Sequence, residues 1–194
     1  VLMRLREICC DPRLVADNWT GSSAKLEACL ELVTEAVAGG HRILLFSQFT
    51  SMLELLAKRL DEAGVSHFTL QGSTPKPVRA EQVRRFNQGE ADVFLISLRA
   101  GGTGLNLTAA DIVIHYDPWW NLAAQNQATD RAYRIGQRNP VQVYRLIAQD
   151  TIEEKIVELQ QAKQSLADTV TGGADGAILS MNPEQLLQLL GEEA

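Results

Sequence analysis

The stretch from Val93 to Gln137 constrains the fold more than any other part of the sequence, because two apolar runs flank a glycine-rich segment within it. Val93 to Ser97 contains Val, Phe, Leu and Ile in succession, which predicts a strand buried on both faces. Ala100 to Gly104 follows, and its missing side chains allow backbone N–H groups to approach a ligand closely. A second apolar run, Ile112 to His115, predicts the next strand.

After the second run, Asp117-Pro118-Trp119-Trp120-Asn121 opens a predicted helix that carries Arg131 and Arg134. These arginines are three residues apart, so they share one helix face. A glycine loop at a strand end, followed by a helix with paired arginines, suits phosphate chemistry. A solvated helix face is the other interpretation of these arginines and of Gln127, although Asp130 is the only carboxylate close to them in this segment.

Strand patterns and helical patterns alternate along the rest of the chain as well. Ser51 with Glu54, and Thr151 with Glu154, have the spacing of N-terminal capping boxes. Strands that alternate with helices through short loops predict a parallel sheet of about five or six strands, with helices on both faces. The further predicted strands are 42–47, 67–70 and 141–147, and the further predicted helices are 25–38, 51–63, one that follows Pro77 and ends at Gly89, and one that begins at Thr151.

Both ends of the chain depart from this alternation. Apolar residues recur at helical spacing near the start until Pro12 stops the pattern. Because the pattern is already under way at Val1, we expect a piece of a longer protein. From Thr171 the sequence TGGADG predicts a mobile hinge, and Asn182-Pro183 then begins a short apolar helix. The apolar residues of the first pattern are Leu2, Leu5, Ile8 and Cys9.

The net charge of −6 means that the chain as a whole is not basic, so any nucleic-acid contact must come from a local basic patch. The cysteines and histidines are too scattered for a zinc site or a disulfide framework, so no metal site is expected. We interpret the cysteines as small buried side chains in a reducing cytosol. We find no signal-peptide pattern and no apolar run long enough to span a membrane. The cysteines are Cys9, Cys10 and Cys29, and the histidines are His41, His67 and His115.

Ligands of parallel α/β sheets bind at the carboxyl ends of the strands. Candidate residues follow four predicted strands in succession. One such loop could be ordinary, but four together predict a binding site at this edge of the sheet. The candidates are Gln48 and Phe49 after the first strand, Gly72 and Ser73 after the second, Arg99 to Gly104 after the third, and Asp117 to Asn121 after the fourth.

The glycine-rich segment has two interpretations. Gly101, Gly102 and Gly104 could simply form a tight turn. The neighbouring Thr103 and Asn106 add hydroxyl and amide donors, which favours a loop that faces phosphate. Spacing alone does not distinguish the phosphate of a nucleotide from that of DNA.

Two further groups of residues carry open alternatives. Trp119 and Trp120 are adjacent, so only one of them can point inward on a regular element. Trp119 has two possible roles on this evidence, a half-buried hydrophobic lid or a ligand contact. Arg79, Arg84 and Arg85 cluster on one predicted helix, where a solvated face and a DNA contact are both open.

Two segments, AGGTGLNLTAADIVIHYDPWWN and QATDRAYRIGQ, resemble the fifth and sixth helicase motifs of SWI/SNF-type DNA-translocating ATPases, in the bacterial HepA-like branch of helicase superfamily two. The resemblance extends from about Leu2 to Leu166. The sequence departs from the family at Leu122, where proline is usual, at Arg99, where lysine is common, and at Asp11, where histidine is frequent. The resemblance implies the RecA-like C-terminal lobe of a P-loop NTPase-like motor, folded as three α/β/α layers.

The resemblance also implies boundaries and roles. Residues 1–22 would be the segment that joins two motor lobes, 23–170 the lobe itself, and 171–194 a flexible hinge with a short helix. Arg131 and Arg134 would act as catalytic arginine fingers. The implied nucleotide-cleft residues are Gly102, Thr103, Gly104, Asn106 and Gln127, and the implied DNA-binding residues are Gln48, Phe49, Gly72, Ser73, Ser97, Arg99 and Trp120.

The sequence contains neither a G-x-x-x-x-G-K-[ST] phosphate loop nor an Asp-Glu-x-His box. In the family both belong to the N-terminal RecA-like lobe, which would hold most of the ATP and Mg²⁺. We therefore expect this chain alone to be an inactive monomer whose partners are that lobe and double-stranded DNA in the bacterial cytoplasm, near the nucleoid, with no membrane contact. A strand-separating superfamily-two DNA or RNA helicase and a stand-alone, non-enzymatic DNA-binding or regulatory module are the alternatives.

Overall fold

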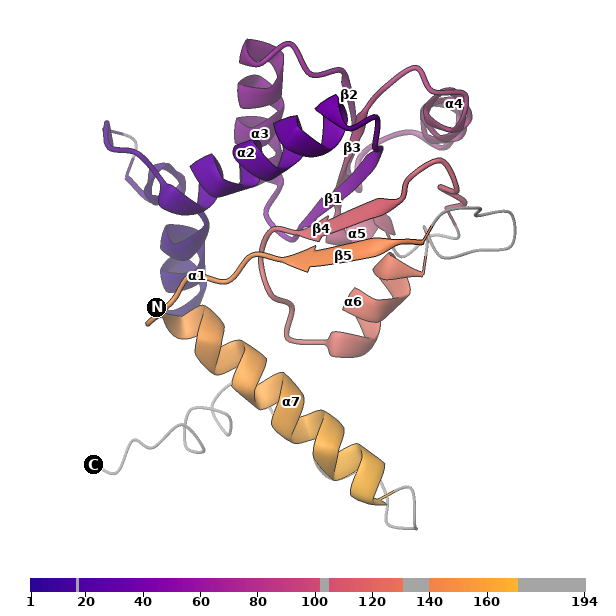
Figure 1. Cartoon of the computed structure of the whole chain (residues 1–194). Coiled ribbons are helices and arrows are strands. Elements are labelled where there is room, and N and C mark those ends of the chain that lie inside the picture. The colour runs from indigo at the N-terminus through magenta and orange to yellow at the C-terminus, as the bar shows by residue number, and fades with distance from the viewer. Residues whose placement is uncertain (17, 102–104, 131–139, 171–194) are drawn as a thin grey trace, which may run out of the picture.

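The computed structural model describes residues 1–16, 18–101, 105–130 and 140–170, and its centre is a five-stranded parallel sheet (Figure 1). The strand order is β2-β3-β1-β4-β5, and every neighbouring pair is parallel. This confirms the predicted parallel α/β fold and its number of strands. The strands are β1 (Ile43–Ser47), β2 (His67–Leu70), β3 (Val93–Ser97), β4 (Ile112–His115) and β5 (Gln142–Arg145).

The burial of the strands follows their place in the sheet. Every residue of β1, β3 and β4 is buried, because helices cover both faces of these central strands. The edge strand β5 pairs only with β4 and is mostly exposed, with Val143 42% accessible. The sequence predicted a strand over 141–147, and the observed strand is shorter because only Gln142 to Arg145 pair with β4.

Successive strand residues point to opposite faces and so belong to two separate apolar layers. Leu45, Leu95 and Ile114 face the first layer, which helices α2 and α3 cover. Phe46, Phe94 and Val113 face the second layer, to which three further helices contribute Phe86, Ala100 and Ala128. The helices of the first layer are α2 (Ala24–Ala38) and α3 (Thr50–Glu62), and those of the second are α4 (Lys76–Asn87), α5 (Leu98–Gly101) and α6 (Leu122–Thr129).

The segments α1 (Leu2–Cys10), η1 (Pro12–Leu14) and α7 (Ile152–Val170) complete the described structure. The arrowheads of β4 and β5 point toward α1 and the start of α7, so these helices lie beside the carboxyl edge of the sheet (Figure 1). None of the described helices has the length and apolar character needed to cross a membrane.

The buried side of α1 does not follow the apolar pattern of its sequence. Leu5 and Ile8 are each 44% accessible, whereas Arg6 and Cys10 are the buried residues of this helix. The physical reason is that α1 packs over the polar turns at the strand ends, where Arg6 finds a backbone acceptor, and only its last residue, Cys10, reaches the first apolar layer.

The two predicted capping boxes have opposite outcomes. Thr151 Oγ1 accepts from the N–H of Glu153 at 3.1 Å, and Glu154 Oε2 accepts from the N–H of Asp150 at 2.9 Å, which confirms a side-chain cap on α7. The capping box at Ser51 is wrong, because α3 already begins at Thr50 and its N-cap residue makes no side-chain cap. That N-cap is Phe49, whose N–H donates to Ser47 Oγ at 3.2 Å.

The glycine-rich segment also begins differently from the prediction. Ala100 and Gly101 belong to the short helix α5 and not to a loop. The remaining glycines of the segment, and the predicted hinge and C-terminal helix over 171–194, lie outside the described residues.

Candidate functional site at the carboxyl edge

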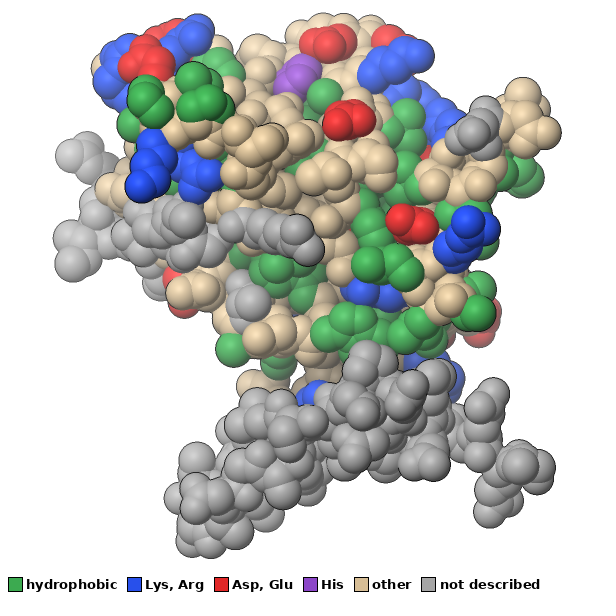
Figure 2. Space-filling model, turned by 180° about the vertical axis from the view of Figure 1, so that it is seen from behind, with side chains coloured by type: hydrophobic (Ala, Val, Ile, Leu, Met, Phe, Trp, Pro, Cys, Tyr) green, Lys and Arg blue, Asp and Glu red, His purple; other side chains and the backbone are tan. Residues whose placement is uncertain are grey.

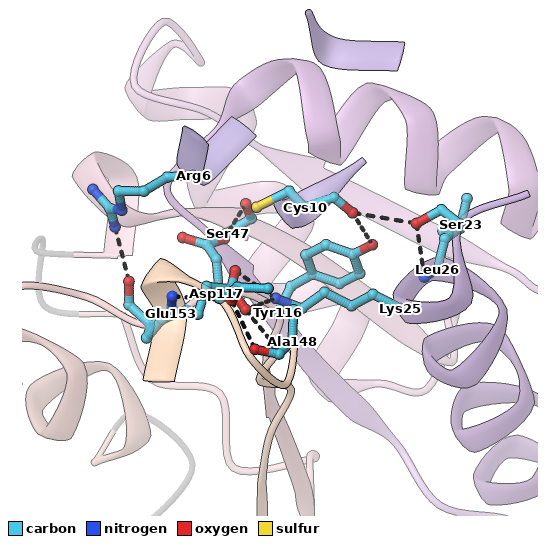
Figure 3. Close-up of polar contacts among 12 residues, drawn as sticks. Arg6, Cys10, Ser23, Lys25, Leu26, Ser47, Tyr116, Asp117, Ala148 and Glu153 are labelled. Carbon is cyan, nitrogen blue, oxygen red and sulfur yellow. Dashed lines mark hydrogen bonds and ion pairs between the residues drawn. The ribbon is translucent and has the colours of Figure 1, made fainter. Parts of the chain in front are cut away.

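The turns after β1 and β4 are joined by one carboxylate. Asp117, two residues beyond β4, accepts from Ser47 Oγ at 2.5 Å (Figure 3). It also accepts from Gln48 Nε2 at 2.5 Å. The backbone N–H of Gln48 also lies 3.3 Å from Asp117 Oδ1. Because β1 and β4 are parallel neighbours, their carboxyl ends place these three residues side by side.

Asp117 is almost inaccessible to solvent, at 1% exposure. Burial raises the pKa of this carboxyl from 3.8 to about 6, because an ionised carboxylate loses hydration there. The hydrogen bond from Ser47, the positive charges of Lys25 and Arg6, and the hydrogen bond from Gln48 oppose this rise in pKa. Both oxygens of this carboxyl group therefore already accept hydrogen bonds from Ser47 or Gln48.

Arg6 reaches the same turns from α1. It is 4% exposed, and its Nη2 donates to the carbonyl oxygen of Pro118 at 2.8 Å. Its guanidinium carbon lies 5.4 Å from the ring centre of Trp120 and 5.9 Å from that of Phe49, which is the range of cation–π contact. Two residues predicted to bind DNA, Phe49 and Trp120, therefore contact the same buried arginine.

A buried ion pair joins the start of α2 to the start of α7. Lys25 Nζ lies 2.5 Å from Glu153 Oε2, and both side chains are almost wholly buried. The N–H of Ala148 also donates to Glu153 Oε2, at 2.8 Å. Close by, the hydroxyl of Tyr116 donates to the carbonyl of Cys10 at 2.9 Å, which ties the end of β4 to α1 (Figure 3).

The adjacent tryptophans point in different directions, as predicted. Trp119 is 3% exposed, and its ring packs edge-on against Phe46 and His115, with centroids 6.4 and 5.8 Å away. Its carbonyl accepts from Gln160 Nε2 of α7. Trp119 is therefore a core residue of the second apolar layer, and Trp120 is the partly exposed member of the pair.

His115 also belongs to the core. Its Nε2 lies 2.9 Å from Thr129 Oγ1, and burial, with a smaller contribution from the charge of Arg145, lowers its pKa to about 4. The ring is consequently neutral at pH 7.

The remaining predicted site residues differ in exposure. Gly72, Ser73, Asn106 and Gln127 are exposed, whereas Ser97 is 3% exposed and accepts from the N–H of Ala100 at 3.4 Å. For Arg99 the structure describes only the backbone, which lies in α5. The other predicted site residues lie outside the described residues, and they are Gly102, Thr103, Gly104, Arg131 and Arg134.

A family model described as "Helicase conserved C-terminal domain" matches residues 24–136, which is more than half of the chain. The chain belongs to this helicase family. The match begins at α2 and runs past the described end of α6, so it contains every turn of the carboxyl edge except the one that follows β5.

Individual relatives agree with this assignment. The helicase lobe is 40% identical to an "Uncharacterized ATP-dependent helicase" of Mycoplasma pneumoniae, over 97% of this chain and 18% of the relative. It is 42% identical to the "Putative ATP-dependent helicase/translocase YwqA" of Bacillus subtilis, over 97% and 21%, and 46% identical to the "Chromatin-remodeling ATPase INO80" of Aspergillus terreus, over 86% and 10%. The lobe thus spans about a fifth or less of these curated relatives.

A solved structure gives the same result. The "C-terminal part of Fun30 ATPase domain" superimposes with a TM-score of 0.69 at 33% identity, covering 81% of this chain and 53% of that chain. The predicted family is confirmed: this is the C-terminal lobe of a superfamily-two helicase with SWI/SNF-type relatives.

Two of the three arginines of α4, Arg84 and Arg85, are paired within the helicase lobe itself. Arg84 Nη2 lies 2.5 Å from Glu81 Oε1, and Arg85 Nε lies 2.7 Å from Glu90 Oε2. Acidic and basic side chains are interspersed over the described part of the face drawn in Figure 2, not gathered into one basic field. Of the two interpretations of Arg84 and Arg85, the solvated face fits these contacts better.

Sequence reasoning missed the buried polar residues that join these turns, although it had identified the turns themselves. Arg6 stands in a helical pattern of apolar residues, and its acceptor Pro118 is 112 positions away. Lys25 and Glu153 are 128 positions apart, and each has the appearance of an ordinary helix-surface charge. We use the name polar edge for these three residues together with Ser47, Gln48 and Asp117 of the turns, so that it consists of Arg6, Lys25, Ser47, Gln48, Asp117 and Glu153.

Proposed function

We propose that this lobe is the half of a SWI/SNF-type, ATP-dependent DNA translocase that closes over ATP and grips the backbone of double-stranded DNA in the cytoplasm. The observation that supports the proposal is the joining of the β1 and β4 turns through Asp117. It holds Gln48, Phe49 and Trp120 together at the edge where parallel sheets bind ligands. Helix α6 leaves from the same turn and leads along the chain to Arg131 and Arg134.

The described carboxylates at this edge do not fit a magnesium ion. Asp117 is fully buried and already accepts hydrogen bonds from Ser47 and Gln48, and Glu153 pairs with Lys25. Mg²⁺ requires oxygen ligands with free lone pairs and usually retains several waters. We therefore assign magnesium and most of the contacts to ATP to the other lobe of the parent protein.

The proposed chemical contribution of this lobe is positive charge. Negative charge develops on the γ-phosphate oxygens during transfer, and a guanidinium offers a permanent charge with forked donors that match those oxygens. Arginines supplied from a second lobe reach the phosphate only when the lobes close, which makes hydrolysis depend on closure. Arginine fingers of this kind accelerate hydrolysis by about 10³–10⁵ where they are characterised.

The proposed DNA contacts are with the backbone and not with base edges. Gly72 and Ser73 are exposed in the turn between β2 and α4, where backbone N–H and hydroxyl groups suit phosphate oxygens. Arg99 would add charge, and Gln48 and Trp120 lie at the neighbouring turns. Such contacts are independent of sequence and weaken steeply with salt, with a slope of about −0.9 in log K for each phosphate neutralised.

The test is ATP hydrolysis by the full-length parent protein, with and without duplex DNA, and with Arg131→Ala or Arg134→Ala. DNA should stimulate the wild type, and each substitution should remove about 10³-fold or more of the stimulated rate while ATP affinity changes little. Arg145→Ala, in the exposed strand β5, is the control and should retain hydrolysis.

Three outcomes would contradict parts of the proposal. Near-normal turnover by either finger variant would remove the arginine-finger role. ATP-dependent separation of the two DNA strands would indicate an unwinding helicase in place of a translocase. A parent protein without any ATPase activity would indicate a non-enzymatic DNA-binding module.

A further inference from the structure

We infer that Arg6 is a positioning residue for DNA binding: from α1, it fixes the rings of Trp120 and Phe49 at the carboxyl edge. The inference rests on the proposed function, because that function places Trp120 beside DNA, with Phe49 in the neighbouring turn. Arg6 itself is buried and is not assigned a DNA contact.

The orientation of α1 is the first observation. This helix exposes Leu5 and Ile8 and buries the charged Arg6, which reverses the usual arrangement of an amphipathic helix. Burial removes hydration from the guanidinium and lowers its pKa, while the charge of Asp117 opposes that shift. An inward charge is unfavourable unless its partners are well placed, so the partners of Arg6 indicate what it does.

Among the described residues, the hydrogen-bond acceptor of Arg6 and the two rings that it contacts belong to the two turns of the candidate site. One N–H donates to the carbonyl of Pro118 at 2.8 Å. The rings of Trp120 and Phe49 lie 5.4 and 5.9 Å from the guanidinium carbon. A planar guanidinium can donate at its edge and contact rings with its faces at the same time, which an ammonium group cannot do.

These partners stand at the starts of two helices. Phe49 is the N-cap residue of α3, and Trp120 lies two positions before α6. Asp117 already joins the two turns to each other through Ser47 and Gln48. Loss of Arg6 would therefore leave the turns joined and Phe49 still packed in the first apolar layer. It would release the partly exposed ring of Trp120 from α1, so the expected damage is to the orientation of that ring.

The experiment uses the full-length parent protein and measures its DNA-stimulated ATPase rate against the concentration of duplex DNA. Arg6→Met keeps the aliphatic stem but removes the charge and the donors. Its matched control is Arg4→Met on the same helix, because Arg4 is exposed. We expect Arg6→Met to raise the KM for DNA about tenfold and to leave hydrolysis without DNA unchanged, with no effect of Arg4→Met.

Two further variants separate positioning from general stability. Arg6→Lys keeps the charge without the planar fork, so its KM for DNA should lie between those of the wild type and Arg6→Met. If Arg6 acts through Trp120, adding Arg6→Met to Trp120→Leu should raise KM little beyond Trp120→Leu alone.

The inference is overturned if Arg6→Met, with its Tm retained, has the same KM for DNA as Arg4→Met, or if the effects of Arg6→Met and Trp120→Leu are fully additive. It is also overturned if both Arg6→Met and Arg6→Lys unfold the lobe, because Arg6 would then act on stability. A wild-type protein that DNA does not stimulate would contradict the proposed function itself, which is a different result.

Discussion

The two apolar layers of the sheet and the polar edge are both shielded from solvent to a large extent, but they are held together in different ways. The layers consist of side chains such as Leu45 and Phe94, whose burial is favourable in any orientation. In the polar edge, Asp117, Lys25 and Glu153 each have specific partners at hydrogen-bond distance. Apolar burial stabilises the sheet, whereas paired buried charges add little net stability and instead fix the positions of the turns.

The largest expected effect is in the second apolar layer, with Phe46→Ala. Phe46 is inaccessible to solvent and packs against the rings of His115 and Trp119. Its removal should lower the free energy of unfolding by about 3–5 kcal/mol, because the favourable transfer of the ring from water to the core is lost and a cavity remains. Urea denaturation of the 194-residue chain measures this.

The control for that substitution is Val143→Ala on the exposed strand β5, which should change the free energy of unfolding by about 0.5 kcal/mol or less. Equal losses for the two variants would show that the layers do not carry the stability of the lobe.

The next effect tests the polar edge. Lys25→Met leaves Glu153 buried without its counter-charge, and should lower the free energy of unfolding by about 3–5 kcal/mol. The double variant Lys25→Met, Glu153→Gln should recover most of the loss, because Gln is neutral and still accepts from the N–H of Ala148. Chemical denaturation of both variants measures this. A double variant as unstable as the single one would mean that the ion pair stabilises the fold directly.

A pH-dependent effect of roughly 3 kcal/mol is expected from Asp117, by linkage from its pKa. Burial raises the pKa of this carboxyl from 3.8 to about 6, so between these values the folded protein holds a proton that the unfolded chain releases. The contribution of Asp117 to stability therefore falls as pH rises through this window, by up to about 1.4 kcal/mol per pH unit.

The comparison that isolates this effect is Asp117→Asn, which has no proton to lose. Between pH 4 and pH 6, the free energy of unfolding of the wild type should fall relative to that of Asp117→Asn. Denaturation of both proteins at several pH values measures this difference. A difference that is constant across this range would show that Asp117 does not titrate there.

The smallest effect concerns a single helix cap. Thr151→Ala removes the acceptor for the N–H of Glu153 and should lower the free energy of unfolding by about 1 kcal/mol. Thr151→Ser keeps the hydroxyl and is the matched control. A loss of similar size in Thr151→Ser would attribute the effect to packing of the Thr151 methyl group, not to the cap.

The apolar layers could be predicted from the sequence because their signals are local. The runs Val93 to Ser97 and Ile112 to His115 predicted central strands, and the structure has strands with the same bounds. The spacing of Thr151 and Glu154 likewise predicted a cap that lies within a few residues of its own helix.

The features that could not be predicted depend on distant parts of the chain. Ser51 has the spacing of a capping residue, but α3 begins earlier, at Thr50, where Phe49 contacts Arg6 and Ser47. The buried role of Arg6 depends on a carbonyl that only the completed sheet brings near it. The turns of the site were thus identifiable, and the contacts that hold them together were not.

The order of strands has a consequence for the synthesis of the protein. Of the five strands, the central strand β1 is synthesised first, but its two neighbours in the sheet are β3 and β4. Ile43 of β1 pairs with Val93 of β3 and with Ile112 of β4, which come about 50 and 70 residues later in the sequence. When residues 43–47 leave the ribosome, neither neighbouring strand has been synthesised, so the apolar segment ILLFS has no strand partner at that stage. Nascent chains in that state are prone to aggregate, and pairings between distant segments form slowly. We therefore expect chains that stall before His115 to need a chaperone or to be degraded.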